Sequence, residues 1–393
     1  MTLTRLLAAP VWRSGFRPFF LGGAIYGPLA LAAWLVALSA PPGVAVPPTV
    51  LWHGHEMLFG FAAAIVAGFV LTALPSWAGT PEVSGGRLMV LAALWLAGRM
   101  AMWGGAGLWP ALAAGVDLLL VPVLLAMIAP GLLAAVDRRF AVLLPILAAM
   151  AAGNAVYHGA TLAGDHVLAH RALVWSTDVL VVLFAVVGGF LTPVFTRTTV
   201  AGLENAVVAS PAIERLAGAT LLLWVAADTM VPDSWPSGIA AAAAAVAHGM
   251  RLWGWRGWRT GRVPVLWVTH VAYLWLVLAL ALQALSDLGA PWPGTVALHA
   301  FTVGALGLMM MGLMSRVVLR HTGRPVQPGP LMVAAFWVMM LAAPVRVAAG
   351  ILADDRWLAV SALLWGLPFI AYLFAHGAFL VRPSLPREAA PER

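Results

Sequence analysis

Long apolar stretches, interrupted by short breaks of Gly, Pro and Arg, run through the whole chain. Each stretch spans about 17 to 25 residues, which is long enough to cross a bilayer as an α-helix. Twelve such helices are predicted, beginning near Phe19, Leu51, Leu88, Pro110, Phe140, Ala172, Ile213, Gly238, Pro264, Gly294, Gly329 and Arg356. The pattern predicts an all-α, polytopic membrane protein in which residues 1–393 form a single twelve-helix transmembrane domain.

The positive charges are distributed unevenly between the predicted loops. All 22 basic residues are Arg, and with the N-terminus placed in the cytoplasm only Arg99, Arg171, Arg346 and Arg356 fall toward the outer side. Because cytoplasmic loops of membrane proteins carry an excess of basic residues, both termini are predicted to be cytoplasmic. The net charge of +7 is thereby explained by topology in a lipid bilayer, and nucleic acid is not an expected partner.

The composition restricts the chemistry that the chain can support. Hydrophobic residues make up 62% of the sequence and charged residues 9%, whereas soluble domains carry about a quarter charged residues. The sequence contains no Cys, which excludes disulfides, thiolate copper sites, iron–sulfur clusters and the covalent attachment of c-type haem. Any metal must therefore be bound by His, Met or carboxylate groups.

Four histidines are predicted to lie in the outer third of the bilayer, on three different helices: His53, His55, His158 and His299. Ionisable groups at membrane depth have to be paired, hydrated or bound to a metal, and neutral imidazole is a ligand of copper, zinc and iron. We therefore predict that these four residues bind metal. Since His53 and His55 are two residues apart, they point roughly 200° away from each other around a helix, so two adjacent sites are expected.

Polar residues near these histidines are candidates for catalysis and for cofactor binding. Glu56 is predicted to carry protons or to orient a ligand imidazole, with an interfacial carboxylate wetted from outside as the alternative. Tyr157, next in sequence to a predicted ligand, is predicted to hydrogen-bond a ligand imidazole or a bound small molecule. Arg99 and Arg346 are predicted to pair with haem propionates, with snorkelling or interhelical ion pairs as the alternative.

Two more histidines are candidate ligands on the cytoplasmic side. His270 is expected about two turns inside its helix, and His321 opens a polar loop. Both are predicted metal ligands because of their depth or loop setting. The alternative for each is an ordinary interface residue near a helix end.

A weak internal repeat of four helices is visible. Similar motifs at 68–72, 189–192 and 312–315 recur about every 120 residues. In this alignment His55 and His299 occupy matching positions in the first and third units. The repeat predicts three four-helix arcs around a pseudo-threefold axis; chance recurrence of short apolar motifs is the alternative.

Several stretches resemble the NnrS family of haem- and copper-containing bacterial membrane proteins linked to nitric oxide metabolism. The resemblance rests on residues 17–20, 52–61, 68–75, 188–197, 270–273 and 299–325. It implies twelve helices in the bacterial inner membrane, haem b and copper as cofactors, and a role in denitrification or nitrosative-stress defence. It assigns no individual ligand, and the candidate haem contacts His55, His299, Arg99 and Arg346 come from the residue pattern instead.

These features together predict a haem-copper oxidoreductase that binds and reduces nitric oxide, with electrons from an external donor and protons arriving past Glu56. Two alternatives stay open: a non-catalytic haem or copper protein that buffers or senses nitric oxide, and a proton-coupled transporter. Three four-helix arcs are similar to the architecture of haem-copper oxidases, which is an analogy of fold only. The chain lacks the His-rich sixth and seventh helices of those enzymes, so His53 and His158 would have to replace them.

Overall fold

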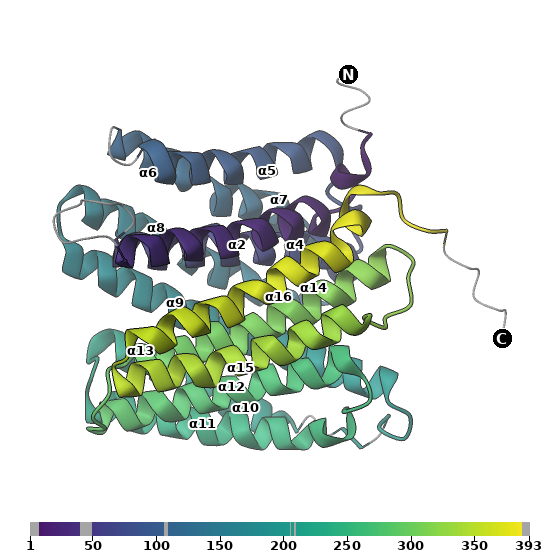
Figure 1. Ribbon diagram of the computed structural model, residues 1–393. Coiled ribbons are helices and arrows are strands. Elements are labelled where there is room, and N and C mark those ends of the chain that lie inside the picture. The colour runs from purple at the N-terminus through teal and green to yellow at the C-terminus, as the bar shows by residue number, and fades with distance from the viewer. Residues whose placement is uncertain (1–7, 40–48, 106–108, 205, 208–209, 387–393) are drawn as a thin grey trace.

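The computed structural model describes residues 8–39, 49–105, 109–204, 206–207 and 210–386. Every regular element in these ranges is a helix (Figure 1). In chain order the elements are η1 (Pro10–Trp12), α2 (Phe16–Leu38), α3 (Val50–His55), η2 (Glu56–Ala62), α4 (Ala63–Ala78), α5 (Gly85–Met100), η3 (Ala101–Gly105), α6 (Pro110–Asp117), α7 (Leu120–Ala134), η4 (Arg138–Val142), α8 (Leu143–Leu162), α9 (His166–Thr199), α10 (Pro211–Met230), α11 (Trp235–Gly254), η5 (Gly257–Arg259), α12 (Pro264–Asp287), α13 (Thr295–His299), η6 (Ala300–Leu306), α14 (Gly307–His321), α15 (Pro330–Leu352) and α16 (Asp355–Val381). The predicted all-α class is confirmed.

Nine segments in the described ranges are long and apolar enough to cross a membrane. They are Phe16–Leu38, Val50–Ala78, Pro110–Ala134, Arg138–Leu162, His166–Thr199, Pro264–Asp287, Thr295–His321, Pro330–Leu352 and Arg356–Val381. Three further helices stand where crossings were expected: α5 has 16 residues, α10 contains Glu214, Arg215 and Asp228, and α11 is rich in Ala. The chain is a multi-pass helical membrane protein, and the expectation of twelve crossings stays a prediction for these three helices.

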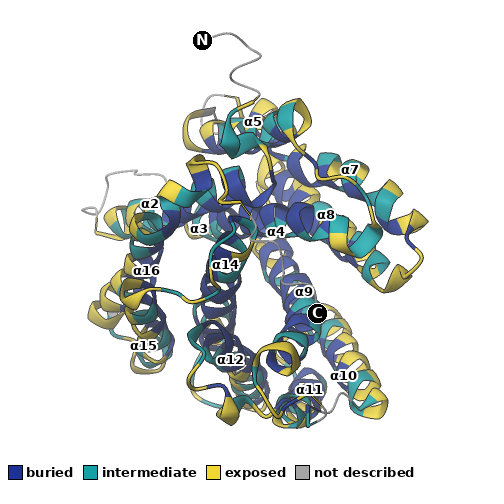
Figure 2. Ribbon diagram, turned by 90° about the vertical axis from the view of Figure 1, so that its right-hand side faces the viewer, coloured by how far each residue is buried: buried dark blue, intermediate teal, exposed yellow. Residues whose placement is uncertain are grey.

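The most buried membrane segments are α3–α4, α9 and α13–α14. Between 67% and 78% of their apolar stretch is buried, against 33% to 39% for the peripheral segments. Viewed along the helices, α4, α9 and α14 lie near the centre, and α12 lies below α14 on the side of α11 (Figure 2). These three segments carry the repeated motif, so each predicted repeat contributes one central segment. The three-arc arrangement itself stays a prediction.

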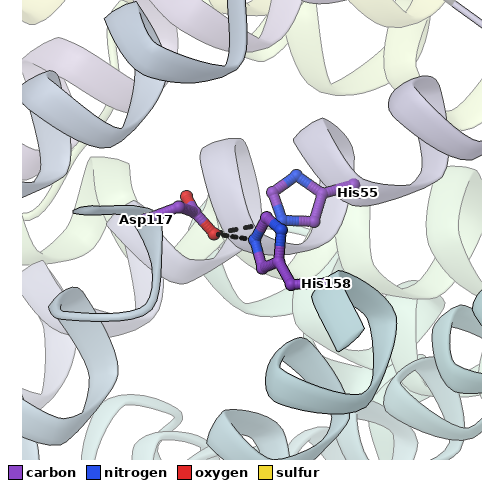
Figure 3. Close-up of side chains that lie close together, drawn as sticks. All are labelled: His55, Asp117 and His158. Carbon is purple, nitrogen blue, oxygen red and sulfur yellow. Dashed lines mark hydrogen bonds and ion pairs between the residues drawn. The ribbon is translucent and has the colours of Figure 1, made fainter. Parts of the chain in front are cut away.

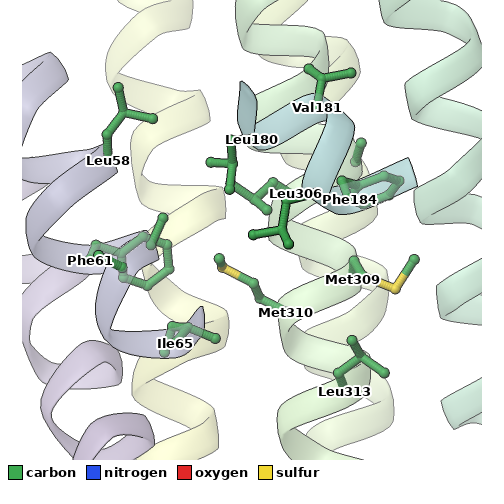
Figure 4. Packing of buried hydrophobic residues seen from close by; sticks show 14 of the residues in the cluster. Leu58, Phe61, Ile65, Leu180, Val181, Phe184, Leu306, Met309, Met310 and Leu313 are labelled. Carbon is green, nitrogen blue, oxygen red and sulfur yellow. The ribbon is translucent and has the colours of Figure 1, made fainter. Parts of the chain in front are cut away.

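Apolar side chains from the three central segments pack against one another in the middle of the bundle (Figure 4). The contributing residues are Leu58, Phe61, Ile65, Leu180, Val181, Phe184, Leu306, Met309, Met310 and Leu313. In lipid, helix association depends on close packing more than on the hydrophobic effect, because the surrounding tails are equally apolar. This packing fixes the relative height of the polar groups that the same segments carry.

Two of the central segments share an interruption of their helical geometry. A π-helix of seven residues follows His55 as η2, and another of seven residues follows His299 as η6. A π segment widens the turn and frees backbone groups from their usual partners, and such segments are frequent at functional sites. In η2 the indole Nε1 of Trp95 donates to the carbonyl oxygen of Gly60 at 2.8 Å. The first and third repeat units therefore match in backbone geometry at their histidines, whereas α9 continues without a break.

Arg17 joins the beginning of α2 to the end of α16. Its side chain is buried, and Nη1 donates to the carbonyl oxygens of Phe379, Leu380 and Arg382 at 2.8 to 3.0 Å. Nη2 donates to Ser384 Oγ at 2.8 Å. The last carbonyl groups of a helix lack intrahelical donors and carry partial negative charge. A guanidinium supplies both the missing hydrogen bonds and a positive charge. The described ends of the chain consequently lie at the same end of the bundle.

Replacing Arg17 by Ala should destabilise the protein, because three helix-terminal carbonyl groups lose a charged donor. We expect a loss of about 2 kcal/mol or more, seen as a lower midpoint of thermal unfolding in detergent. Arg13 is exposed and lies four residues earlier, so Arg13→Ala is the matched control and should leave the midpoint unchanged. Equal midpoints for Arg17→Ala and the unmodified protein would contradict this role.

Candidate metal centre

His55 and Glu56 lie where α3 passes into the π-helix η2, and both side chains are fully buried. His55 Nδ1 is 2.7 Å from Glu56 Oε1. His55 Nε2 is 3.1 Å from Asp117 Oδ2 and 3.0 Å from Asn154 Oδ1. Both ring nitrogens therefore face acceptor oxygens. A neutral imidazole has one N–H and can donate to only one side, so the second side needs either a second proton on the ring or a metal ion in its place.

Asp117 ends α6 just before the turn into α7, and four side chains meet at its carboxylate. Its Oδ2 lies 2.9 Å from His158 Nε2 and accepts a hydrogen bond from Asn154 Nδ2 at 2.9 Å, besides facing His55. Its Oδ1 accepts from Arg99 Nη2. Figure 3 shows the two imidazoles, from α3 and α8, directed at the same carboxylate oxygen.

One ligand atom from each of His55, Asp117 and His158 lies within 4.8 Å of the other two, and all three residues are buried. In the part of the chain that the structure describes, no other group of three His or carboxylate side chains has this spacing. Two imidazole nitrogens with a carboxylate oxygen suit copper, zinc or iron. The structure therefore contains a possible metal site with donors from three helices.

Arg99 compensates the negative charge of this centre. Its guanidinium is buried and donates from Nη1 to Glu56 Oε2 at 2.5 Å and from Nη2 to Asp117 Oδ1. Two carboxylates and one guanidinium leave one net negative charge at membrane depth, where an uncompensated charge is costly. One further positive charge, either a proton on His55 or a monovalent metal ion, makes the centre neutral.

Aromatic side chains enclose the charged groups. Tyr26 donates its hydroxyl hydrogen to Glu56 Oε2 and accepts from Trp103 Nε1 at 2.9 Å. The Tyr157 ring stacks on His55, with centroids 4.6 Å apart, and its hydroxyl points toward the carbonyl oxygen of Leu51 at 3.5 Å. Both predicted catalytic residues, Glu56 and Tyr157, thus contact His55, while their roles in catalysis stay predictions.

His53 and His299 line a different cavity of about 190 Å³, together with Arg346. The His53 ring stacks on Trp34 with centroids 5.1 Å apart, and its buried Nδ1 has no hydrogen-bond partner. His299 Nδ1 donates to the Thr295 carbonyl oxygen at 2.7 Å, so Nε2 is the acceptor of the ring. Arg346 Nη2 lies 3.2 Å from both ring nitrogens and can donate to Nε2, so a ligand at Nε2 would have to displace it. His53 and His55 therefore have different surroundings, and the two adjacent metal sites expected from their angular separation stay a prediction.

The chemistry of this cavity fits a haem. Its walls are largely apolar, with residues from η2, α9, η6 and α16, and its polar groups include three imidazoles, of His53, His170 and His299, and one guanidinium. Imidazole binds haem iron and a guanidinium pairs with propionate. The volume is small beside the roughly 300 to 1,000 Å³ of most ligand pockets. A second cavity of about 680 Å³ adjoins it, however, and shares Val174, Thr177 and Thr295 with its lining.

The two inner histidines belong to neither group. His270 is buried on α12, its Nε2 lies 2.9 Å from Thr196 Oγ1, and its Nδ1 has no partner. His321, the last residue of α14, packs its ring at 5.8 Å from that of Phe16. Metal binding by either residue stays a prediction.

Two members of the centre were not among the residues singled out from sequence for the site. A single Asp in an apolar stretch carries little signal of its own, and the place of Asp117 in the middle of the network depends on where α6 breaks. Tyr26 gave no signal, because one Tyr in an apolar helix is ordinary. Asn154 lies one turn before His158 on α8, and its Oδ1 is 3.0 Å from His55 Nε2.

The fold and the centre define a multi-pass helical membrane protein with a buried site of imidazole, carboxylate and guanidinium groups. The family model of the NnrS protein matches residues 10–384, which is nearly the whole sequence. The chain belongs to the NnrS family, which places it among membrane proteins related to nitric oxide and confirms the resemblance seen in the sequence. Comparison with curated proteins finds no match.

Arg99→Met should strongly destabilise the protein, because Glu56 and Asp117 would lose their shared cation. Removing one partner of a buried ion pair costs about 3–5 kcal/mol, measurable as thermal unfolding in detergent. A double variant, Arg99→Met with Glu56→Gln, should recover part of this loss because the charge deficit is smaller. Arg356→Met, which removes an exposed partner of Asp354, is the control. A single variant as stable as that control would contradict the charge balance described here.

Proposed function

We propose that this protein is a haem- and copper-dependent nitric oxide reductase of the bacterial inner membrane, active in nitrosative-stress defence or denitrification. The observation that carries the proposal is the convergence of His55, His158 and Asp117 in a chain of the NnrS family. Imidazoles from separate helices are brought together with a carboxylate at membrane depth, where ionisable groups have a functional role by default. Membership of the family relates the protein to nitric oxide, and the proposal adds that the protein reduces it.

Copper is the metal proposed for the His55, Asp117 and His158 set. Imidazole nitrogen is a preferred donor for copper, and in this chain thiolate ligands are absent. A single positive charge balances the centre, so Cu(I) matches it without any further counter-ion. With His55 Nε2 on the metal, His55 Nδ1 donates to Glu56 and so fixes the His55 ring, while Asn154 Nδ2 donates to Asp117 Oδ2 and orients that carboxylate.

Haem is proposed for the cavity of His53 and His299. Nδ1 of His299 is already fixed by the Thr295 carbonyl, an arrangement that orients a ligand imidazole and raises its basicity. Arg346, whose Nη2 lies 3.2 Å from the His299 ring nitrogens in this structure, would turn from the imidazole to a propionate when haem binds. When bound, haem iron and copper would supply the centres that bind nitric oxide and pass electrons to it.

The residues of the chain supply access and protons. Nitric oxide is small and apolar, so it can enter the apolar cavity from the lipid. The proposed reaction converts two nitric oxide molecules, two electrons and two protons into nitrous oxide and water, with electrons from an external donor. Glu56 is hydrogen-bonded to Tyr26 and Arg99, which places a buried carboxylate with fixed donors next to His55. We assign it the transfer of protons toward that side of the site.

Substitution of the proposed ligands should separate the two cofactors. His55→Ala and His158→Ala should each lower bound copper by at least about tenfold, and His299→Ala should do the same for haem. Metal analysis and the Soret absorbance of purified protein measure these losses. His166→Ala, an exposed histidine on α9, is the control and should retain both cofactors. Full copper retention in His55→Ala and His158→Ala would refute the copper assignment.

Turnover distinguishes reduction from the other two functions. Purified protein with an artificial reductant should consume nitric oxide and release nitrous oxide, measured with a nitric oxide electrode and gas chromatography. Haem that binds nitric oxide without release of nitrous oxide would favour a buffer or sensor. Protein that carries neither Soret absorbance nor copper after expression with both available would leave the transporter.

A further inference from the structure

Arg346 of α15 is a cation without an acidic partner. It lines the cavity of about 190 Å³ that it shares with His53 and His299, and no Asp or Glu is among the described residues of that lining. None of the ion pairs within the described ranges includes Arg346. A guanidinium stays protonated in proteins, and charges at membrane depth need compensation. The cavity therefore carries one positive charge that no carboxylate of the described chain contacts.

Most of the hydrogen-bond donors of this guanidinium are unused. Nη2 lies 3.2 Å from both ring nitrogens of His299 and can donate to Nε2, since Nδ1 is occupied by the Thr295 carbonyl oxygen. Nε and Nη1 of Arg346 have no hydrogen-bond partner among the residues that the structure describes. The side chain is half-buried and lines the cavity, so the guanidinium is accessible to a guest. A neutral imidazole supplies a lone pair to Arg346 but no negative charge.

The other polar side chains of the cavity favour a guest that accepts hydrogen bonds. The hydroxyl groups of Thr177, Thr302 and Ser361 each donate to a backbone carbonyl oxygen, at 2.9, 3.0 and 3.3 Å, so their hydrogens are already used. His53 makes no hydrogen bond with any part of the chain that is described, so its N–H stays available. A cation would be repelled by Arg346, whereas an anion satisfies both its charge and its free donors.

The size and the opening of the cavity select a small, water-soluble guest. Its volume of about 190 Å³ compares with about 30 Å³ for one molecule in liquid water and about 300 to 1,000 Å³ for most ligand pockets. An ion of three heavy atoms fits this space. Val50, His170 and Thr295 on the cavity wall are exposed and lie near the beginnings of α3, α9 and α13. The cavity therefore opens where these three helices begin, and an ion can enter there.

We propose that this cavity binds a small monovalent oxyanion whose two oxygen atoms have the spacing of a carboxylate, such as nitrite or formate, and that Arg346 recognises it. Two such oxygens match the planar fork of a guanidinium, and one negative charge neutralises the cavity. The inference does not rest on the proposed function, because it concerns the protein without haem. The two meet at Arg346, since a haem propionate has the same chemistry and would compete with the free anion for this residue.

Thermal unfolding of the full-length protein, prepared without haem or copper, tests the anion site. A ligand that binds the folded state raises the unfolding midpoint. Sodium nitrite or sodium formate, replacing sodium gluconate at constant ionic strength, should therefore raise the midpoint to a plateau. Arg346→Met should weaken the apparent affinity at least about tenfold, and Arg346→Lys, which keeps the charge, should retain part of the shift.

Arg171→Met is the matched control, because Arg171 is exposed on the wall of the adjoining cavity, and it should show the full shift. Since Arg346 has no acidic partner among the described residues, Arg346→Met should unfold at the same midpoint as the unmodified protein when no anion is added. A lost shift in this variant is then not a lost fold. Equal shifts in the unmodified protein and in Arg346→Met, or the absence of a plateau, would overturn the anion site.

Haem-loaded protein distinguishes the free anion from the propionate. With the iron kept ferrous, so that formate does not bind it, the formate shift should be largely lost when haem is present. A full formate shift in haem-loaded protein would leave the anion site standing and refute the pairing of Arg346 with a propionate. If Arg346→Met weakens haem binding but no anion shifts the haem-free protein, the anion site is overturned. If the chain binds no haem at all, the proposed function fails, while the shifts of the haem-free protein still decide the anion site.

Discussion

The arrangement of the site depends on one constraint, which is that charges buried at membrane depth must be balanced by other buried charges. Arg99 meets that constraint for Glu56 and Asp117, which lie on two other segments. Because its guanidinium is planar and forked, it can bind both carboxylates at once and hold them at a set separation. His55 and His158 are then aligned on Asp117 from the opposite side. The arrangement of the candidate ligands His55, Asp117 and His158 therefore depends on Arg99, which is not itself a candidate ligand.

The same constraint is met differently in the three central segments. The first pairs His55 with a centre whose negative charge Arg99 reduces to one, and the third pairs His299 with Arg346. Each of these histidines ends an α-helix directly before a π segment of seven residues. The second central segment, α9, has no π segment and carries Asp178, which lines the larger cavity together with Asp228 of α10. Ionisable groups on all three central segments therefore surround one apolar core.

Much of the fold could be predicted because a helix that crosses the bilayer needs a long stretch of apolar residues. Apolar length marks the membrane segments, and the all-α class follows, since backbone groups in lipid must be satisfied within the helix. The depth of His55, His158 and Asp117 could be read from their distance to the polar breaks. The contacts between them could not, because they depend on helix rotation and on irregular backbone. Neither the π-helix after His55 nor the break between α6 and α7 has a clear sequence signature, and both decide where side chains point.

The small residues of η2 and α4 also show how far contacts can be predicted from sequence. The strip of Gly60, Ala64 and Gly68 fits either a porphyrin face or a neighbouring helix, and sequence favours the helix only by frequency. In the structure a Cβ at Gly60 would come within 2.6 Å of the Tyr26 ring and 2.8 Å of Arg99, and one at Gly68 within 2.9 Å of Phe19. The strip is thus filled by protein, and Gly60 is needed so that Tyr26 and Arg99 can approach Glu56. A glycine chosen for close packing therefore also determines the charge balance of the metal centre, so packing and chemistry cannot be assigned to separate residues in this core.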